Sequence, residues 1–327
     1  NLLFSARKWG VGKSAIVAVI SLKYDLFSGC LNMNPKIRTA ILKRLRFYSL
    51  CLLVLLVLAQ VLALFWYPLE WFSHFSLHGC VLILLASFAF KRRYRYILWA
   101  ICLSVIVWAF FPLSGSLKNE QAIKIISYNI YFENKEKDKE IAFLLNQNAD
   151  ILALTEMGGL AWQNQLSVLQ QHYPYSCGHS LDSPFAMQLF SKQKPLSCEV
   201  HFIEDSYPYI QAVLPNQKTL FVLHPPPPVN GELANDRLTY FQKTAQKIAH
   251  DNNAVLVIGD LNNTPFSPIY RRFKKNSGLQ DAMYKALPTW KPFFLPLDRV
   301  LYRQSKVKAK ALSWQYSDHR AVEILWQ

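Results

Sequence analysis

Three long apolar segments in the first third of the chain most limit what it can fold into. They cover residues 47–69, where Gln60 is the only strongly polar side chain, residues 71–90, which two histidines interrupt, and residues 96–113. A helix of about 20 apolar residues crosses the hydrocarbon core of a bilayer. Buried helices of a soluble core can have this composition, but three in succession, followed by an ordinary sequence, favour a bundle in lipid. We therefore predict an all-α transmembrane segment of about three helices.

The basic residues that flank the apolar segments form two clusters, which are predicted to lie on the same side of the membrane. Five precede the first segment and four lie between the second and the third: Lys36, Arg38, Lys43, Arg44 and Arg46, then Lys91, Arg92, Arg93 and Arg95. The connection between the first two segments has no Lys or Arg. Because positively charged loops stay in the cytoplasm, both clusters are predicted to be cytoplasmic and everything after about Ser114 to be outside.

The same distribution explains the formal net charge of +15. Thirteen of the 36 Lys and Arg residues, but only two of the 21 acidic residues, lie in residues 1–113. The excess positive charge therefore accompanies the predicted spans, where membrane topology accounts for it. High net charge does not indicate a nucleic-acid-binding surface in this chain.

Residues 1–32 fit neither the membrane segment nor the domain that follows it. We expect Met33, which directly precedes the first basic cluster, to be the native start. Residues 12–14 resemble the end of a phosphate-binding loop, but Arg7 stands where the first glycine of such a loop belongs, so we discount the motif. The predicted organisation is an N-terminal extension with a basic cytoplasmic segment (residues 1–46), three transmembrane helices (47–113) and a catalytic domain (114–327).

The last two-thirds of the chain alternate β-rich runs with amphipathic helical ones. Strands are expected at residues 123–130, 151–155, 185–190, 210–214, 219–224, 254–259, 299–302 and 321–326. Helices are expected at residues 135–147, 160–171, 232–250 and 268–275. This mixture predicts an α/β fold, a two-sheet β-sandwich flanked by helices on its outer faces.

Polar side chains lie at one end of six of these strands, at or after the end of the first four and before the start of the last two. They are Asn129, Glu156, His224, Asp260 with Asn262, Asp298, and Asp318 with His319. Turn chemistry is the ordinary explanation of any one Asn or Asp after a strand, and a lone histidine is usually structural. Six strand ends that each supply such a group are harder to attribute to turns. We therefore expect these groups to meet in one cleft at an edge of the sandwich.

The order of these motifs resembles the endonuclease/exonuclease/phosphatase superfamily, which includes deoxyribonucleases, apurinic endonucleases, neutral sphingomyelinases and inositol-polyphosphate phosphatases. The motifs are SYN (residues 127–129), TE (155–156), LH (223–224), GDLN (259–262), LDR (297–299) and SDH (317–319). The resemblance covers about residues 122–327, and residues 259–267 particularly resemble bacterial membrane-anchored members. It implies a deoxyribonuclease-like fold and the hydrolysis of phosphate esters.

The resemblance also implies a role for each site residue. Metal binding is implied for Glu156 as the principal ligand, with Asn129 close by and Asp318 as a further carboxylate; catalysis is implied for His224, Asp260, Asn262, Asp298 and His319. Asp260 would orient or deprotonate the attacking water, and Asn262 would fix phosphate or water geometry. His319 would donate to a phosphoryl oxygen, Asp298 would hold its tautomer, and His224 would be the second donor. Mg²⁺, with Mn²⁺ as a substitute, is the implied cofactor because it prefers oxygen ligands.

Several positions depart from the family pattern or stay open. Tyr131 stands where some relatives carry a second acid, and Arg299 stands where close relatives often have His. The sequence does not identify an acidic partner for His224. Arg237 is either a phosphate contact or, in the preferred interpretation, part of a solvated helix face. Cys177 and Cys198, the only thiols after residue 113, are equally compatible with a disulfide and with two free thiols.

Together these observations predict a membrane-anchored, metal-dependent phosphoesterase, a multi-pass protein of the bacterial inner membrane with a periplasmic or extracellular catalytic domain. Its substrate would be a phosphodiester or phosphomonoester in nucleic acid or in a phospholipid or inositol phosphate headgroup. The predicted partners are this substrate and the membrane, and nothing in the sequence indicates a protein partner. The alternative is a catalytically silent, membrane-anchored binding or scaffold protein that uses the same pocket.

Overall fold

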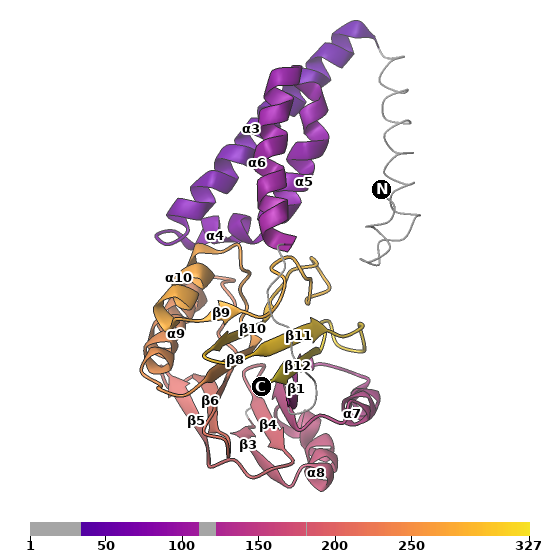
Figure 1. Cartoon of the computed structure of the whole chain (residues 1–327). Helices are drawn as coiled ribbons and strands as arrows, with labels where there is room; N and C mark the ends of the chain where they lie inside the picture. Colours follow the sequence, from indigo (N-terminus) through magenta and orange to yellow (C-terminus); the bar gives the residue numbers. More distant parts are fainter. Residues whose placement is uncertain (1–33, 111–121, 181) are drawn as a thin grey trace.

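The computed structural model describes residues 34–110, 122–180 and 182–327 (Figure 1). Met33, residues 12–14 and the end of the third predicted apolar segment lie outside these residues. The described chain forms a helical region and, at one end of it, a sandwich of two sheets covered by helices (Figure 1).

The helical region is formed by the first part of the described chain. It contains α3 (Pro35–Leu62), α4 (Tyr67–His74), α5 (Ser76–Ala86), the 3-10 helix η2 (Ser87–Ala89) and α6 (Arg92–Phe110). Among the described residues, α3 and α6 are long and apolar enough to cross a membrane. Helix α4 and the segment up to residue 89, bent by 62°, would form a third span if the pair is counted as one. The predicted all-α segment is confirmed as two to three candidate spans.

The helix at the first predicted span does not have the bounds of the apolar segment. Helix α3 begins at Pro35, so it includes the first basic cluster, and it ends at Leu62 instead of continuing to residue 69. A turn then leads into α4, which has Pro68 in its first turn. Apolar residues continue through this turn, so composition could not show the break, whereas the fixed φ of proline suits the start of a new helix.

Small and apolar side chains hold the helices of this region together. Leu56 of α3 packs against the backbone of Gly79 on α5, where an added Cβ would lie 2.6 Å from Leu56 Cδ1. Gln60 donates to the hydroxyl of Ser76 over 3.2 Å, so the one strongly polar side chain of the first apolar segment has a partner on a neighbouring helix. Large apolar side chains such as Val57 face outward, as expected for helices in lipid.

The two basic clusters lie at the same end of the helical region. Arg46 Nε donates to the carbonyl oxygen of Ala89, just before the second cluster, over 2.6 Å. The sandwich lies at the opposite end, next to α4 and the last turn of α6 (Figure 1). There Trp71 Nε1 donates to the carbonyl oxygen of Pro228 over 2.9 Å. The amide of Ala286 donates to the carbonyl oxygen of Ala109 over 3.3 Å. The helical region and the sandwich therefore share a direct interface.

Each sheet of the sandwich has six strands and one parallel pair at its centre. The orders are β11-β12-β1-β2-β4-β3 and β5-β6-β7-β8-β10-β9, with β1 parallel to β2 and β7 parallel to β8. The first sheet contains β1 (Ile123–Asn129), β2 (Ile151–Thr155), β3 (Tyr175–His179), β4 (Met187–Ser191), β11 (Val307–Ala311) and β12 (Val322–Trp326). The second contains β5 (Ser197–Ile203), β6 (Tyr207–Val213), β7 (Thr219–Leu223), β8 (Val255–Asp260), β9 (Gln280–Asp281) and β10 (Asp298–Arg303).

Helices cover the outer faces of both sheets. They are α7 (Lys137–Asn146), the 3-10 helix η4 (Leu160–Trp162) and α8 (Gln163–His172) on the first sheet, and α9 (Gly231–Ala249) and α10 (Pro268–Ser277) on the second. Neighbouring residues of a strand serve opposite layers: Leu256 packs between the sheets and Val257 packs under α9 and α10. Strands buried on both faces explain the continuous apolar runs. The predicted two-sheet sandwich flanked by helices is confirmed.

Cys177 on β3 and Cys198 on β5 form a disulfide, with their Cα atoms 6.2 Å apart. These strands are the edge strands of different sheets, so the bond joins the two sheets at one side of the sandwich. The question that the sequence left open is thus answered in favour of pairing.

All eight predicted strands and all four predicted helices have counterparts within a few residues, but four strands were missed. These are β3, β5, β9 and β11. All four are edge strands that combine partial exposure with polar residues, such as Lys308 and Lys310 on β11. Such strands have only one buried face or none, so they do not show the apolar runs of the central strands.

Candidate active site

The two parallel strand pairs bring the predicted residues to one edge of the sandwich. The parallel strands β1 and β2 end together at Asn129 and Thr155. In the other sheet β7 ends at Leu223, directly before His224, and its parallel neighbour β8 ends at Asp260. Because β10 is antiparallel to β8, its first residue, Asp298, lies directly opposite Asp260. Carboxyl ends of parallel strands meet at one edge of a sheet, so the topology itself gathers these groups.

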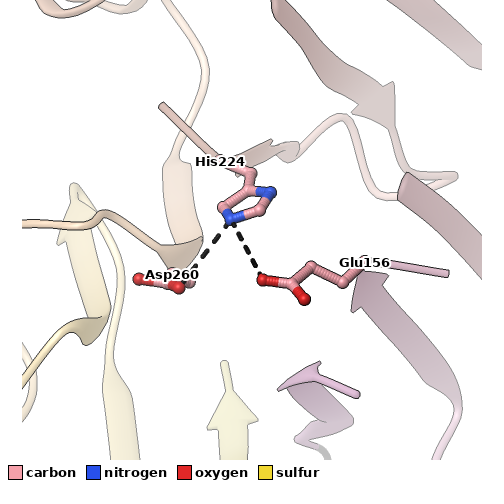
Figure 2. Close-up of side chains that lie close together, drawn as sticks. All are labelled: Glu156, His224 and Asp260. Carbon is pink, nitrogen blue, oxygen red and sulfur yellow. Dashed lines mark ion pairs between the residues drawn. The ribbon is translucent and has the colours of Figure 1, made fainter. Parts of the chain in front are cut away.

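Glu156, His224 and Asp260 form the centre of the site (Figure 2). One ligand atom of each lies within 4.8 Å of those of the other two. His224 Nε2 is 4.0 Å from Glu156 Oε1 and 3.8 Å from Asp260 Oδ2. The Asp260 side chain is 2% exposed and that of Glu156 17%, so the cluster is open on the Glu156 side.

Asn129 fixes the distance between the two carboxylates. Its Nδ2 donates to Glu156 Oε1 over 2.7 Å and to Asp260 Oδ2 over 3.1 Å, while its Oδ1 accepts from the amide of Tyr131. The other oxygen of Glu156 accepts from the amide of Phe132 over 2.9 Å. Both Glu156 and Tyr131 have positive φ, a costly conformation for residues other than glycine that recurs at functional sites.

His319 and Asp298 form a buried pair beside this centre. His319 Nδ1 lies 2.8 Å from Asp298 Oδ2, and its Nε2 lies 3.6 Å from Asp260 Oδ2. Burial alone would lower the pKa of His319, but the carboxylates of Asp298, Asp260 and Asp318 outweigh it and raise the pKa to about 10. His319 is therefore a cationic donor at neutral pH.

His224 differs from His319 in having no carboxylate at hydrogen-bond distance. Its Nδ1 is buried without a hydrogen-bond partner among the described residues, and its backbone amide donates to the hydroxyl of Tyr240 over 3.2 Å. Phe185 packs against the ring with centroids 5.9 Å apart. The ring is thus held by packing, while Nε2 faces Glu156 and Asp260.

Gly259 allows Asp260 and His224 to come close. It has a φ of 132°, and a Cβ there would lie 2.1 Å from the carbonyl oxygen of Leu223. Beyond Asp260, the chain turns at Asn262, whose amide donates to Asp260 Oδ1 over 2.8 Å and whose side chain donates to the carbonyl oxygen of Pro225 over 3.0 Å. The GDLN motif therefore ties β8 to the loop after His224.

Asp318 lies at the edge of the cluster. Its Oδ2 accepts from Trp290 Nε1 over 2.9 Å, and it does not belong to the group whose ligand atoms lie within 4.8 Å of one another. Trp290, treated as packing in the sequence analysis, also lies against the His319 ring with centroids 6.4 Å apart. No sequence signal distinguished Trp290 from the other tryptophans.

Two hydroxyl groups that sequence reasoning did not assign orient the backbone at the site. Ser317 Oγ donates to the carbonyl oxygen of Asn129 over 2.8 Å and accepts from the amide of His319 over 3.0 Å. Thr289 Oγ1 accepts from the amide of Asp298 over 2.9 Å. Only Ser317 could have been found from sequence, because it belongs to the SDH motif.

The two arginines singled out in the sequence are both buried. Arg299 pairs with Asp281 over 3.2 Å, on the other side of β10 from Asp298, so it is a core residue outside the cluster. The preferred interpretation of Arg237 as part of a solvated face is wrong. Its side chain is 0% exposed and pairs with Glu70 of the helical region, which the sequence could not reveal because the two residues are 167 positions apart.

The donor set at the centre fits a hard divalent cation. Two carboxylates and one imidazole nitrogen converge, and among the described residues only histidines form ion pairs with Glu156 or Asp260. Two nearby carboxylates without a Lys or Arg partner leave negative charge that a cation would neutralise. Mg²⁺ and Mn²⁺ both accept such oxygen-rich sites.

A family model described as Endonuclease/Exonuclease/phosphatase family matches residues 126–319, more than half of the chain. Comparison with curated protein sequences gives no match.

The fold is similar to several solved structures. Sphingomyelinase C from Streptomyces griseocarneus gives a TM-score of 0.52 at 17% identity, covering 63% of this chain and 99% of that one. A double mutant of beta toxin from Staphylococcus aureus with bound magnesium ions gives 0.51 at 16% identity, covering 63% and 100%. A humanised TDP2 from D. rerio gives 0.50 at 17% identity, covering 63% and 99%. At these identities the likeness concerns the fold.

Proposed function

The chain belongs to the endonuclease/exonuclease/phosphatase family, and we propose that it is a membrane-anchored, Mg²⁺-dependent phosphoesterase of the bacterial type, with its active site on the side of the membrane opposite to its basic clusters. The observation that carries the proposal is the convergence of Glu156, His224, Asp260 and His319 from four separate strand ends. A sandwich alone does not require buried carboxylates and imidazoles to face one another.

The metal would be held by Glu156 as the principal ligand, with Asn129 close by, orienting the carboxylates of Glu156 and Asp260, and with Asp318 as a further carboxylate nearby. When bound, the ion would neutralise the charge that develops on the phosphoryl oxygens. The magnesium ions bound in the beta toxin structure support the choice of metal. Mn²⁺ is the expected substitute because it accepts the same ligands.

Each remaining residue would act on a defined atom. Asp260 Oδ2 would orient the attacking water and take its proton, and Asn262 would keep Asp260 in place through its amide. His319 would donate from Nε2 to a phosphoryl oxygen, because Asp298 holds Nδ1 and keeps the ring cationic. His224 Nε2, 3.8 Å from Asp260 Oδ2, would supply the second donor.

The arrangement of the helical region supports the proposed topology. The basic clusters lie at one end of the candidate spans and the sandwich lies at the other, which is the arrangement that the positive-inside rule requires of an exported domain (Figure 1). We propose that residues 34–110 anchor the chain in the inner membrane and that the domain from about residue 122 onward is the periplasmic or extracellular catalytic domain. The disulfide agrees with an oxidising compartment.

Hydrolysis of bis-p-nitrophenyl phosphate by the full-length protein tests this proposal. We expect activity with Mg²⁺ or Mn²⁺, none with EDTA, and a loss of roughly 10²–10⁴-fold in Asp260→Ala and His319→Ala. Asp138→Ala, which removes an exposed carboxylate on α7, is the matched control and should retain activity. Equal rates in all four proteins would instead favour the silent binding or scaffold protein.

The substrate class is either nucleic acid or a phospholipid or inositol phosphate headgroup. The similar structures include both a sphingomyelinase and TDP2, so the fold does not choose between them. Parallel assays with plasmid DNA, sphingomyelin vesicles and inositol phosphates separate these classes, provided that Asp260→Ala abolishes the activity that is found.

A further inference from the structure

Glu70 is a fully buried carboxylate in the short helix α4 of the helical region. It is the only acidic residue between residues 34 and 110. A carboxylate removed from water costs several kcal/mol unless charged or polar partners surround it. Three of the partners that surround Glu70 come from the sandwich.

These partners belong to α9 and to the loop between β8 and α10. Glu70 Oε2 accepts from Arg237 Nη2, and its Oε1 accepts from Ser267 Oγ over 2.6 Å and from Asn263 Nδ2 over 3.2 Å. One turn further along α4, His74 Nδ1 lies 3.0 Å from Thr264 Oγ1. Residues of one short helix therefore hold the loop that follows Asp260 at several points.

Arg237 connects Glu70 to the proposed active site. Its Nη1 lies 3.3 Å from the carbonyl oxygen of Asn262, to which it donates, and its side chain is 0% exposed. Asn262 has a φ of 46°, and its amide donates to Asp260 Oδ1. The contacts thus run without interruption from Glu70 to Arg237, to Asn262 and to Asp260.

We propose that Glu70 is a positioning residue for the phosphoesterase reaction, so that the helical region completes the active site in addition to anchoring it. Through Arg237, Glu70 holds Asn262 in its unfavourable backbone conformation and thereby fixes Asp260. This inference rests on the proposed function. A buried ion pair is often no more stabilising than apolar side chains of similar size, so a purely structural interface would not need these charges.

Three variants of the full-length protein in detergent or nanodiscs test the proposal. Glu70→Gln leaves Arg237 buried without a counter-ion and should lower both kcat and the unfolding temperature. The double variant Glu70→Met/Arg237→Met replaces the pair by apolar side chains. Lys285→Met removes a different contact between the sandwich and the helical region, from Lys285 Nζ to the carbonyl oxygen of Trp108. It serves as the interface control and should retain wild-type kcat.

The double variant separates positioning from stability. We expect its unfolding temperature to return to within a few degrees of wild type, whereas Glu70→Gln lies roughly 10 °C lower. Its kcat should remain about 10–100-fold below wild type with KM little changed, the usual size of effect for residues that orient active-site ligands. Recovery of kcat together with stability would show a purely structural role and overturn the proposal, as would a wild-type kcat in Glu70→Gln.

Hydrogen exchange at the amides of residues 260–264 gives a readout that does not depend on turnover. We expect faster exchange in both Glu70 variants than in wild type and Lys285→Met. If wild type hydrolyses no phosphate ester but exchange responds in this way, the proposed function fails and the positioning contact stands. If wild type is active and exchange is unchanged in both Glu70 variants, the positioning role fails alone.

Discussion

At the scale of single residues, Asp260 is where the contacts of the site meet. Its two side-chain oxygens accept from Asn129 and from the amide of Asn262, and both His224 and His319 place Nε2 within 4 Å of Oδ2. Burial to 2% exposure makes each of these interactions stronger than it would be in water. Asp260 is thus the residue whose position the surroundings define most completely.

Asp298 should control the pH range in which His319 can donate a proton. Because its carboxylate raises the pKa of His319 to about 10, the ring stays cationic until pH approaches that value. Asp298→Asn removes this carboxylate, so the pKa should fall by roughly 1–3 units and the cation should be lost at correspondingly lower pH. The pH dependence of kcat for bis-p-nitrophenyl phosphate checks this: the alkaline decline should move to lower pH in Asp298→Asn.

The raised pKa of His319 also makes the stability of the folded state depend on pH. A histidine whose pKa is raised on folding stabilises the folded state fully below its ordinary value of 6.5. This contribution is lost as pH rises from 6.5 through about 10. A decline of kcat at the same pH in wild type and Asp298→Asn, with unfolding showing the same pH dependence in both, would contradict the assignment.

The convergence of these side chains could be predicted from sequence better than the contacts around them. Asn129, Glu156, His224, Asp260 and His319 lie at strand ends, where one-dimensional patterns are informative. The environment of Arg237 and the hydrogen bond from Trp290 depend on residues far along the chain or on loop conformation, so no local pattern could reveal them.

At the scale of elements, central strands were predicted and edge strands were not. The central strands β1, β2, β7 and β8 are buried on both faces, and burial selects the apolar runs that sequence analysis detects. The edge strands β3, β5 and β11 are partly exposed, so their polar residues conceal them. The break between α3 and α4 was hidden for the opposite reason, because apolar residues continue through the turn.

The disulfide between the edge strands should contribute measurably to stability. Cys177 and Cys198 are 21 positions apart, and closing a loop of this size in the unfolded chain is worth about 2–4 kcal/mol. Replacing both by Ser should lower the free energy of unfolding by this amount, measured by chemical denaturation. Activity at low temperature should be retained, since neither cysteine contacts the cluster around Asp260. Unchanged stability in the double Ser variant would show that the bond does not form in the native protein.

At the scale of the whole molecule, the two parts of the chain were predicted separately, and only the structure relates them. Apolar length and charge indicated the helical region, and strand-end chemistry indicated the sandwich. Neither pattern predicts the ion pair between Glu70 and Arg237 or the hydrogen bonds between α4 and the loop at residues 263–267.

The proposed orientation predicts which surfaces a membrane-impermeant thiol reagent can reach. Asp138→Cys, on exposed helix α7, should be labelled in intact spheroplasts, whereas Lys91→Cys, in the connection before α6, should be labelled only after the membrane is permeabilised. The protein without either substitution shows the background labelling of the native cysteines. Labelling of Lys91→Cys but not of Asp138→Cys in intact spheroplasts would mean the opposite orientation.

Direct binding of Mn²⁺, a spectroscopic substitute for Mg²⁺, tests the convergence of side chains around one cation most directly. Electron paramagnetic resonance of the full-length protein should show Mn²⁺ bound at a site that Mg²⁺ competes for. Glu156→Gln, which keeps the size of the side chain and removes its charge, should weaken this binding at least about tenfold, while Asp138→Asn leaves it unchanged. Equal Mn²⁺ affinity in wild type and Glu156→Gln, or phosphate-ester hydrolysis that persists in EDTA, would contradict the account.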